Sequence, residues 1–148
     1  MIIISHRGNL NGQNPEKENS PSYITEAVSA GFDVEVDVWW DKNSLWLGHD
    51  NPQWKVTEEF LNTIKTKLWI HCKNLEAVEK LMNTQYHWFW HQEDSVTLTS
   101  KGYAWCFPEK EITGGIMVDK GQKTSKNIIG VCTDHAQTWK QELKGKRT

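Results

Sequence analysis

The sequence predicts an α/β fold, a compact (β/α) barrel in which several outer helices are shortened or missing. Strand-like and helix-like segments alternate over the first 82 residues, which implies parallel strands joined by right-handed crossovers. Short strand-like segments then follow closely, for a total of seven or eight strands. A full eight-stranded barrel takes about 250 residues, whereas 148 residues leave roughly 18 for each strand and its connection. The alternative is an open parallel sheet with a helical first half and a β-rich second half.

Local signals define the elements of the first half. Ser20 is suited to cap a helix that has Pro21 in its first turn and ends at Gly31. Valines alternate with acidic residues in the next strand, which predicts one apolar and one acidic face. The first half is assigned a strand ending near His6, the helix from Pro21, a strand over Phe32–Val38, a helix capped by Thr57, a strand over Leu68–Cys72 and a helix capped by Asn74.

Beyond Met82 the connections are too short or too polar for good helices. A last amphipathic helix is predicted after Asp134, which is assigned as its cap. The expected strands are His87–His91, Thr97–Thr99, Tyr103–Phe107, Ile116–Val118 and Ile128–Cys132. Because no linker or repeat divides the chain, we expect a single domain over residues 1–148.

Composition and charge exclude several classes of protein. With 37% hydrophobic residues, 24% charged residues and a mean hydropathy of -0.67, the chain has a globular composition without an apolar run of membrane-spanning length. The 17 basic and 19 acidic residues give a formal charge of -2, so we expect no nucleic-acid partner and no stable membrane insertion. Met1–Arg7 lacks the features of a secretory signal, and a cytoplasmic location is expected. In such a location the three cysteines are expected to be reduced and buried.

Two acidic residues on the alternating strand predict a metal site. Glu35 and Asp37 leave the same face of a strand, with Cα atoms roughly 6.5 Å apart. Two carboxylates this close repel each other unless a cation or a basic group lies between them, and hard divalent ions prefer oxygen ligands. An acidic edge strand that faces solvent is the alternative, although the valines on the opposite face favour an interior strand.

Histidines follow two of the predicted strand ends. His6 follows the first strand and His49 follows Leu45–Leu47, so the two could serve as acid and base near neutral pH. Lys73 shares a face with His71 on the third strand, where an inward lysine needs an anionic partner. The alternatives are two histidines in surface loops and a lysine that points to water.

These residues resemble a known family, the glycerophosphodiester phosphodiesterases within the phosphatidylinositol-phospholipase-C-like superfamily. The resemblance covers roughly residues 1–75 and has a weaker counterpart near the C-terminus. The matching blocks, in family order and at near-family spacing, are His6-Arg7-Gly8, Glu18-Asn19, residues 31–38, Gly48-His49-Asp50 and, more weakly, Ile129–Asp134.

The resemblance implies a TIM-type barrel that cleaves phosphodiesters with a divalent metal ion at the carboxyl ends of its strands. The residues that match Glu35 and Asp37 bind the metal in the family, and those that match His6 and His49 act as acid and base. The expected substrate is a glycerophosphodiester or a related lipid head-group diester.

Four more residues are expected to bind the substrate. The resemblance assigns Arg7 and Glu18 to contacts with the phosphate or to organising the site, and Lys73 to the anionic group of the substrate. Nine tryptophans are many for this length, and we expect most to be core or barrel-shell residues. Trp105 and Trp39 are the two expected to be pocket walls.

His71 departs from the family pattern, which has an acidic third metal ligand two residues before the lysine. An imidazole removes one negative charge and one oxygen from the metal site. The cofactor is therefore expected to be Mg²⁺, Ca²⁺ or Mn²⁺, with the imidazole weakening the first two and favouring Mn²⁺ or Zn²⁺.

Two other functions stay open at this stage. A reduced barrel could keep the anion pocket as a phosphate-ester-binding module with little or no catalysis. The tryptophans could instead form an aromatic surface for a carbohydrate or a protein partner. Missing outer helices would also leave apolar strand faces uncovered, which favours a homodimer.

Overall fold

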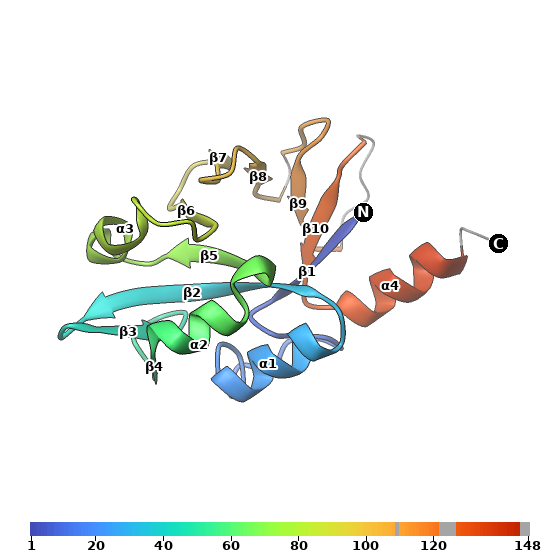
Figure 1. Cartoon of the computed structure of the whole chain (residues 1–148). Coiled ribbons are helices and arrows are strands. Elements are labelled where there is room, and N and C mark those ends of the chain that lie inside the picture. The colour runs from blue at the N-terminus through green and yellow to red at the C-terminus, as the bar shows by residue number, and fades with distance from the viewer. Residues whose placement is uncertain (109, 122–126, 146–148) are drawn as a thin grey trace.

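A computed structural model describes residues 1–108, 110–121 and 127–145 (Figure 1). The strands are β1 (Ile2–His6), β2 (Asp33–Asp41), β3 (Ser44–Leu47), β4 (Trp54–Val56), β5 (Leu68–Cys72), β6 (Trp88–Trp90), β7 (Val96–Leu98), β8 (Ala104–Cys106), β9 (Ile116–Val118) and β10 (Gly130–Thr133). The helices are α1 (Pro21–Ser29), α2 (Glu58–Thr63), the short 3-10 helix η1 (Lys65–Lys67), α3 (Leu75–Leu81) and α4 (Ala136–Gly145). Within the described ranges, none of them has the length and apolar character needed to span a membrane.

In the part of the chain that the structure describes, the strands join one 10-stranded sheet in which most neighbours are parallel. β1 lies between β2 and β10, while β5 pairs with β2 and β6 pairs with β5. On the other side of β1, the strands β10, β9 and β8 follow as parallel neighbours. The antiparallel strands β3 and β4 extend from β2, and β7 runs antiparallel to β8. The carboxyl ends of the parallel strands therefore lie at one rim of the sheet.

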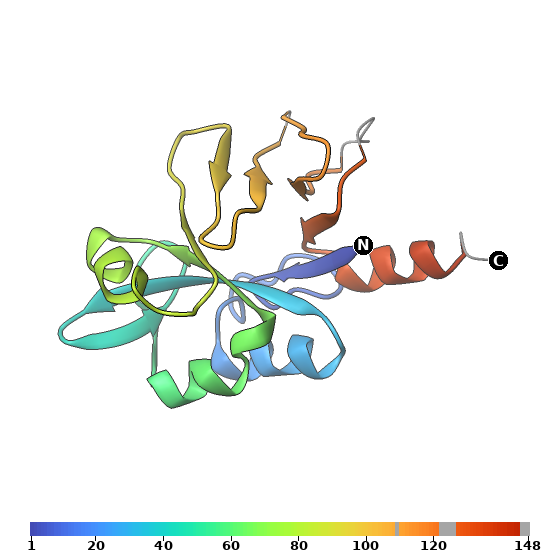
Figure 2. The ribbon, with the colours of Figure 1, turned by 45° about the horizontal axis from the view of Figure 1, so that its top comes forward.

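The predicted TIM-type barrel is wrong. The sheet is mixed and curls into a half-barrel, and the described residues contain only four short α-helices. Figures 1 and 2 show α1 and α2 beneath β2, whereas the described residues between β6 and β9 form no helix where a barrel would have them. The reason is the length of the connections, because residues 91–95, 99–103 and 107–115 are each shorter than the roughly dozen residues of a helical crossover.

The alternative expected from the sequence, an open parallel sheet with a helical first half and a β-rich second half, agrees with the structure in one respect. The chain does divide into a first part with α1, α2 and α3 and a second part of short strands. The sheet is nevertheless neither purely parallel nor flat, since three of its strand pairs are antiparallel and its two ends curl toward each other.

A seam separates β6 from β7 in the curled sheet. In the described part of the chain β6 pairs with β5 alone. Across the seam, Ser100 N donates to Trp88 O at 2.7 Å and Thr97 Oγ1 donates to Trp90 O at 2.8 Å. The rings of Phe89 on β6 and Trp105 on β8 stack with their centroids 4.5 Å apart. Side chains and isolated hydrogen bonds thus hold the two ends of the sheet together where a strand ladder is missing.

Most sequence signals for the individual elements are confirmed. α1 begins after Ser20, although that side chain makes no capping hydrogen bond. Thr57 Oγ1 accepts from Phe60 N at 3.1 Å at the start of α2, and Asn74 Oδ1 accepts from Ala77 N at 3.0 Å at the start of α3. Strand β4 was not predicted.

The two faces of the sheet bury different cores. The valines of β2 pack on the convex side against residues of the helices, including Ile24, Ala27 and Leu61. The concave side holds a second cluster of Ile4, Trp69, Phe89, Trp105, Ile116, Val118 and Cys132. The predicted alternation is confirmed, because the acidic residues of β2 then face the concave side. Cys72, Cys106 and Cys132 are free and buried, as expected.

The turn after β1 requires glycine at position 8. Gly8 has a φ of 94°, in the left-handed region that disfavours residues with a β-carbon. A β-carbon at this position would lie 2.6 Å from Tyr23 Cδ2 and 3.2 Å from the Tyr23 backbone. The chain therefore passes closely over α1 as it leaves β1, and this approach positions the neighbouring Arg7.

We predict that Gly8→Ala destabilises the protein more than Gly102→Ala does. Both positions have positive φ, at 94° and 84°, so both alanines carry backbone strain of about 1–2 kcal/mol. Of these two alanines, the one at position 8 would collide with Tyr23, which adds about 1–3 kcal/mol of overpacking. The one at position 102 has no described atom within 4 Å of its β-carbon. Urea unfolding of the two variants measures the difference, and equal losses would contradict the close approach of Gly8 to Tyr23.

Candidate functional site

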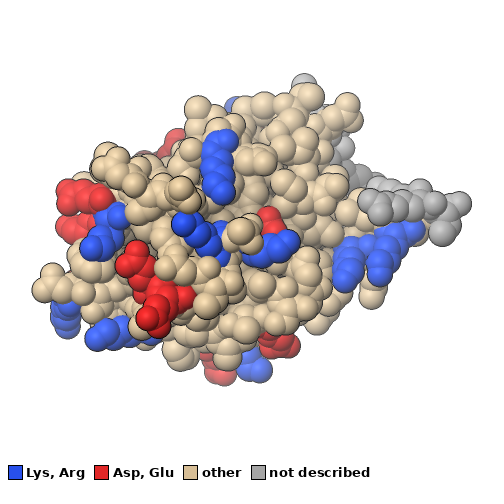
Figure 3. Space-filling model, in the orientation of Figure 1, with Lys and Arg blue, Asp and Glu red and all other residues tan. Residues whose placement is uncertain are grey.

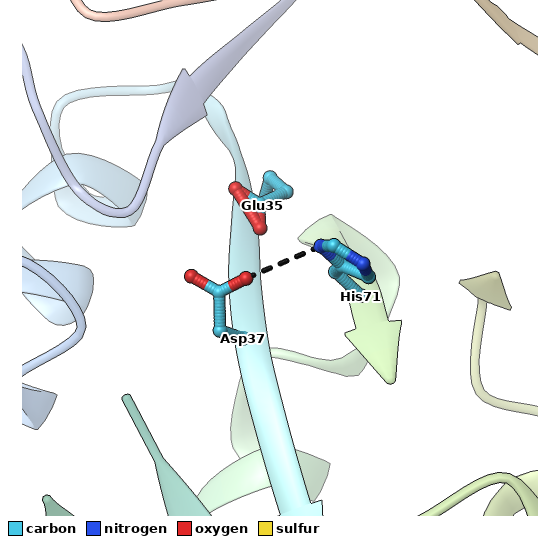
Figure 4. A group of neighbouring side chains, drawn as sticks. All are labelled: Glu35, Asp37 and His71. Atoms are coloured by element: carbon cyan, nitrogen blue, oxygen red, sulfur yellow. Dashed lines mark ion pairs between the residues drawn. The ribbon is translucent and has the colours of Figure 1, made fainter. Parts of the chain in front are cut away.

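Strand register brings four polar side chains together at the rim of the sheet. His6 pairs with Glu35 across the ladder of β1 and β2, and Asp37 pairs with His71 across the ladder of β2 and β5. Paired residues in parallel strands point to the same face, so all four side chains lie on the concave side. Figure 4 shows Glu35 and Asp37 reaching from β2 toward His71 on β5.

Glu35, Asp37 and His71 form a group that could hold a metal ion. One ligand atom from each lies within 4.8 Å of the others. Both carboxylates are buried. Glu35 Oε2 has no hydrogen-bond partner among the described residues, whereas Asp37 Oδ1 faces the ring of His71, with Nδ1 at 3.3 Å. Buried carboxylate oxygens without donors are costly unless a cation or a proton compensates them. Two carboxylates and one imidazole are a donor set that fits a divalent ion.

The two carboxyl groups have opposite pKa shifts. Burial, together with the negative charge of Asp37, raises the pKa of Glu35 well above its ordinary value. Burial also raises the pKa of Asp37, but the hydrogen bond from His71 and the charge of Arg7 outweigh it and hold that pKa well below its ordinary value. Without a cation, Glu35 is therefore the group that keeps a proton and Asp37 the one that keeps the charge.

His71 faces an acceptor with each ring nitrogen. Its Nδ1 lies 3.3 Å from Asp37 Oδ1, and its Nε2 lies 3.0 Å from the carbonyl oxygen of His91. A carbonyl can only accept, so Nε2 keeps its proton and the ring is held in one orientation. Nδ1 faces the Asp37 carboxylate and is the ring nitrogen that could ligate a metal ion. A metal-binding histidine anchored by a backbone carbonyl has this arrangement.

Arg7 is held in place by two carboxylates. Its Nε lies 3.0 Å from Asp37 Oδ2, and its Nη1 lies 3.3 Å from Glu18 Oε1. Burial lowers the pKa of Arg7, but the charges of Glu35 and Asp37 more than offset this and raise it. The other oxygen of Glu18 accepts from Asn14 N at 2.7 Å. Glu18 thus organises the position of Arg7, which is one of the two tasks that the resemblance implies for it.

His6 is oriented by a carboxylate from the far end of the chain. Its Nδ1 donates to Asp134 Oδ1 at 2.7 Å, and its Nε2 lies 3.6 Å from Glu35 Oε2. The hydrogen bond from His6 overcomes the effect of burial and holds the pKa of Asp134 well below its ordinary value. Asn9 Nδ2 also donates to Asp134, at 2.9 Å. His6 therefore presents Nε2 to the metal-binding group.

His49 lies between β3 and β4 and is more exposed than the rest of the site. Its side chain is 45% exposed, and its Nδ1 lies 2.8 Å from Asp50 Oδ1. Burial and the positive charge of Arg7 lower its pKa. A β-carbon on the preceding Gly48 would lie 2.0 Å from Asn51 O, so the loop that carries His49 is tightly turned.

A cavity of about 500 Å³ connects these side chains. Lys73, which follows β5, adds a positive charge to its wall, and Trp105 belongs to an aromatic part of the wall. Trp39 does not line this cavity, and its Nε1 donates to Gly48 O at 2.7 Å. The lining residues from the predicted site are His6, Arg7, Glu35, His49, His71, Lys73 and Trp105. Glu18 lines a smaller adjoining cavity of about 270 Å³ that also reaches Arg7 and His49.

Three residues of the site were not predicted to take part in it. Asn19 Nδ2 donates to Asp37 Oδ2 at 2.9 Å, and Asn19 Oδ1 accepts from Asp37 N at 3.0 Å. Asp134 was assigned as the cap of α4, yet its carboxylate orients His6. His91 lines the cavity between the ends of β6 and β7. The Glu18-Asn19 and Thr133-Asp134 pairs were noticed as parts of the family resemblance, whereas His91 lies where that resemblance is less clear.

Comparisons with known proteins do not identify the chain. A scan against models of protein families, a search of curated proteins and a search of solved structures each found no match. The resemblance to the glycerophosphodiester phosphodiesterases therefore rests on the motifs and stays a prediction.

We predict that Glu35→Gln stabilises the metal-free protein near neutral pH and removes its response to metal. Folding raises the pKa of the Glu35 carboxyl group, so the folded state holds this proton more tightly than the unfolded state does. The free energy of unfolding therefore falls as the pH rises between the unfolded and the folded pKa. Glutamine cannot ionise, so the variant lacks this loss but also lacks a metal ligand. Unfolding free energies measured from pH 4 to 8 in chelator, and melting temperatures with and without Mn²⁺, check both parts. A variant that is less stable than wild type at pH 7 in chelator would contradict the assignment.

Proposed function

We propose that this protein cleaves phosphodiesters of the glycerophosphodiester or lipid head-group type with the help of a divalent cation. The observation that supports this most is a group of three potential metal ligands, two of which line the same cavity as an oriented histidine. Glu35, Asp37 and His71 supply the ligands, and His6 is held beside them by Asp134. The imidazole of His71 favours Mn²⁺ over Mg²⁺ or Ca²⁺ as the cation.

The charges around the cavity suit the chemistry of a phosphodiester. The negative charge of the diester repels an attacking nucleophile, so a catalyst has to neutralise it. A divalent cation bound by the metal-binding group supplies positive charge against the phosphoryl oxygens. Lys73 adds a charge from the wall of the same cavity, while Arg7 holds Asp37 in position. On the face seen in Figure 3, basic and acidic side chains are interspersed, so an anionic substrate would have to be recognised by these local groups.

Two histidines provide the proton transfers. One of His6 and His49 removes the proton from the attacking hydroxyl, which belongs to water or to a neighbouring group of the substrate. A new P–O bond then forms, and the bond to the leaving alcohol breaks as the other histidine protonates its oxygen. The carboxylate of Asp134 keeps the Nδ1 proton of His6 in place, so His6 Nε2 is the nitrogen that exchanges protons.

We predict that His6→Ala and His49→Ala each reduce phosphodiester cleavage by at least about 100-fold, because each removes an acid or a base. Turnover of glycerophosphocholine is measured with Mn²⁺, Mg²⁺ or Ca²⁺. His135→Ala is the control, since His135 is exposed and does not line the cavity. Turnover that is equal in wild type and His49→Ala would rule out the proposal.

A phosphate-ester-binding module with weak or no catalysis is the second candidate. It is favoured by the exposure of His49 and by the pairing of Arg7 with two carboxylates, which leaves Arg7 less free to contact a phosphate. Calorimetric binding of glycerol phosphate without turnover under any of the three cations would support it, whereas turnover that depends on His49 would exclude it.

Two further expectations from the sequence belong to the proposal. Among the described residues, the large hydrophobic side chains that are exposed are Met1, Leu75, Met82, Leu98, Phe107, Ile112 and Ile129. Four of these seven lie in the half of the chain that has few helices, which supports the expected homodimer. Sedimentation equilibrium tests this expectation. A cytoplasmic location stays a prediction.

A further inference from the structure

A second cavity, of about 570 Å³, lies away from the candidate site. It shares no lining residue with the cavity of about 500 Å³, since Trp88 at the start of β6 lines the former and Trp90 at the end of β6 lines the latter. Its walls come from η1, the residues after α3, the start of β6 and the turn between β7 and β8. Small-molecule sites have volumes of about 300–1,000 Å³, so this cavity is large enough for a ligand of its own.

Two lysines give the second cavity a positive charge. Lys65 Nζ lies 5.0 Å from the centroid of the Tyr86 ring, which is within the range of a cation–π contact and keeps the ammonium group at the wall. Lys101 lines the cavity from the turn between β7 and β8. The lining contains no Asp or Glu, and no carboxylate in the described part of the chain forms an ion pair with either lysine. An anion that enters therefore meets two ammonium groups without a counter-charge.

The hydroxyl groups in the lining already have partners within the protein. Ser100 Oγ accepts from Trp88 N at 2.9 Å and donates to Tyr86 O at 3.2 Å. Thr84 Oγ1 donates to Leu81 O at 2.7 Å. Recognition of a polar group in this cavity therefore depends mainly on the charge of the two lysines.

Apolar side chains lie in the same lining. Met82, which follows α3, is 53% exposed, and Trp88 is only partly buried where it packs against the convex core. A hydrocarbon tail that covers these side chains removes apolar area from water, which favours binding. The cavity thus combines positive charge with an apolar surface.

We infer that this cavity binds a small amphiphile that has one anionic head group and a hydrocarbon tail. The head group pairs with Lys65 and Lys101, and the tail covers Met82 and Trp88. Because Trp88 and Ser100 lie on opposite sides of the seam, the ligand also ties the two ends of the curled sheet together. It adds to the hydrogen bond that Ser100 N donates to Trp88 O at 2.7 Å. This inference does not depend on the proposed phosphodiesterase activity.

Octanoate is the probe for this site, in titration calorimetry with a chelator so that the potential metal ligands hold no cation. We expect binding of one octanoate per protein. Butanoate, with the same head group and a shorter tail, should bind at least about tenfold more weakly. Octyltrimethylammonium, with the same tail and the opposite charge, should not bind. Octyl phosphate has a tail of the same length, and the tighter ligand of the two identifies the preferred head group.

Lys65→Met and Lys101→Met remove the charge and keep an apolar side chain of similar length. We expect each to weaken octanoate binding by about three- to fivefold, which is the size expected for an ion pair that is partly open to water. Lys55→Met is the matched control, because Lys55 is exposed and lines neither cavity. Lys73→Met removes a lysine from the other cavity and should leave octanoate binding unchanged.

Hydrogen exchange at the Ser100 amide tests the link to the seam. Octanoate should slow this exchange in the wild-type protein and have less effect in Lys101→Met. Unchanged octanoate affinity in both Lys65→Met and Lys101→Met, or a loss of binding in Lys73→Met alone, overturns the site. Equal binding of octyltrimethylammonium overturns the role of charge, and binding without slower Ser100 exchange overturns the link across the seam. Melting curves of the variants show whether each keeps its fold, and none of these results requires phosphodiester turnover.

Discussion

The buried carboxylate of Asp37 is the point on which the candidate site depends. Arg7 and Asn19 bond one of its oxygens, and His71 faces the other at 3.3 Å. An unpaired charge in a protein interior costs several kcal/mol, so these partners have to be present for β2 to carry an acidic residue on its buried face. Because they come from the turn after β1, the loop before α1 and strand β5, the charge of Asp37 ties three segments together.

The same carboxylate accounts for unusual backbone conformations nearby. Arg7 and Asn19 both have positive φ, at 58° and 69°, which is uncommon for residues with a side chain. Asn19 N donates to Arg7 O at 3.0 Å, so the two strained residues also support each other. Strain of this kind persists only where surrounding contacts determine the conformation, and here the contacts to Asp37 do so.

The missing helices are compensated by large side chains inside the curl of the sheet. Trp69 lies between Tyr103 and Trp105, with ring centroids 5.0 and 5.8 Å from it, and Phe89 stacks on Trp105. Aromatic rings bury much apolar area per residue, which a chain of this length needs because it has few residues to spare for a core. The packed rings form the floor of the curl, and the polar site lies above them at the carboxyl ends of the strands.

Local patterns allowed much of the fold and part of the site to be predicted. The alternation in β2 placed Glu35 and Asp37 on one face, and the caps Thr57 and Asn74 marked where α2 and α3 begin. The position of His71 beside the two acids was expected from the family resemblance, which has a metal ligand two residues before the lysine at the end of the third strand. The bond between His6 and Asp134 joins residues at opposite ends of the chain, and no local pattern indicates such a contact.

The sequence by itself determined most of the segments that form strands and helices, though not β4, and the acidic face of β2, because periodicity and capping act within a few residues. The tertiary structure alone decided that the sheet curls into a half-barrel and does not form a barrel with alternating helices. It also decided which carboxylate bonds each histidine, as with His91 and Asp94 or His6 and Asp134. Strand register and ring packing between distant segments decide these features, since they depend on the relative free energies of whole arrangements.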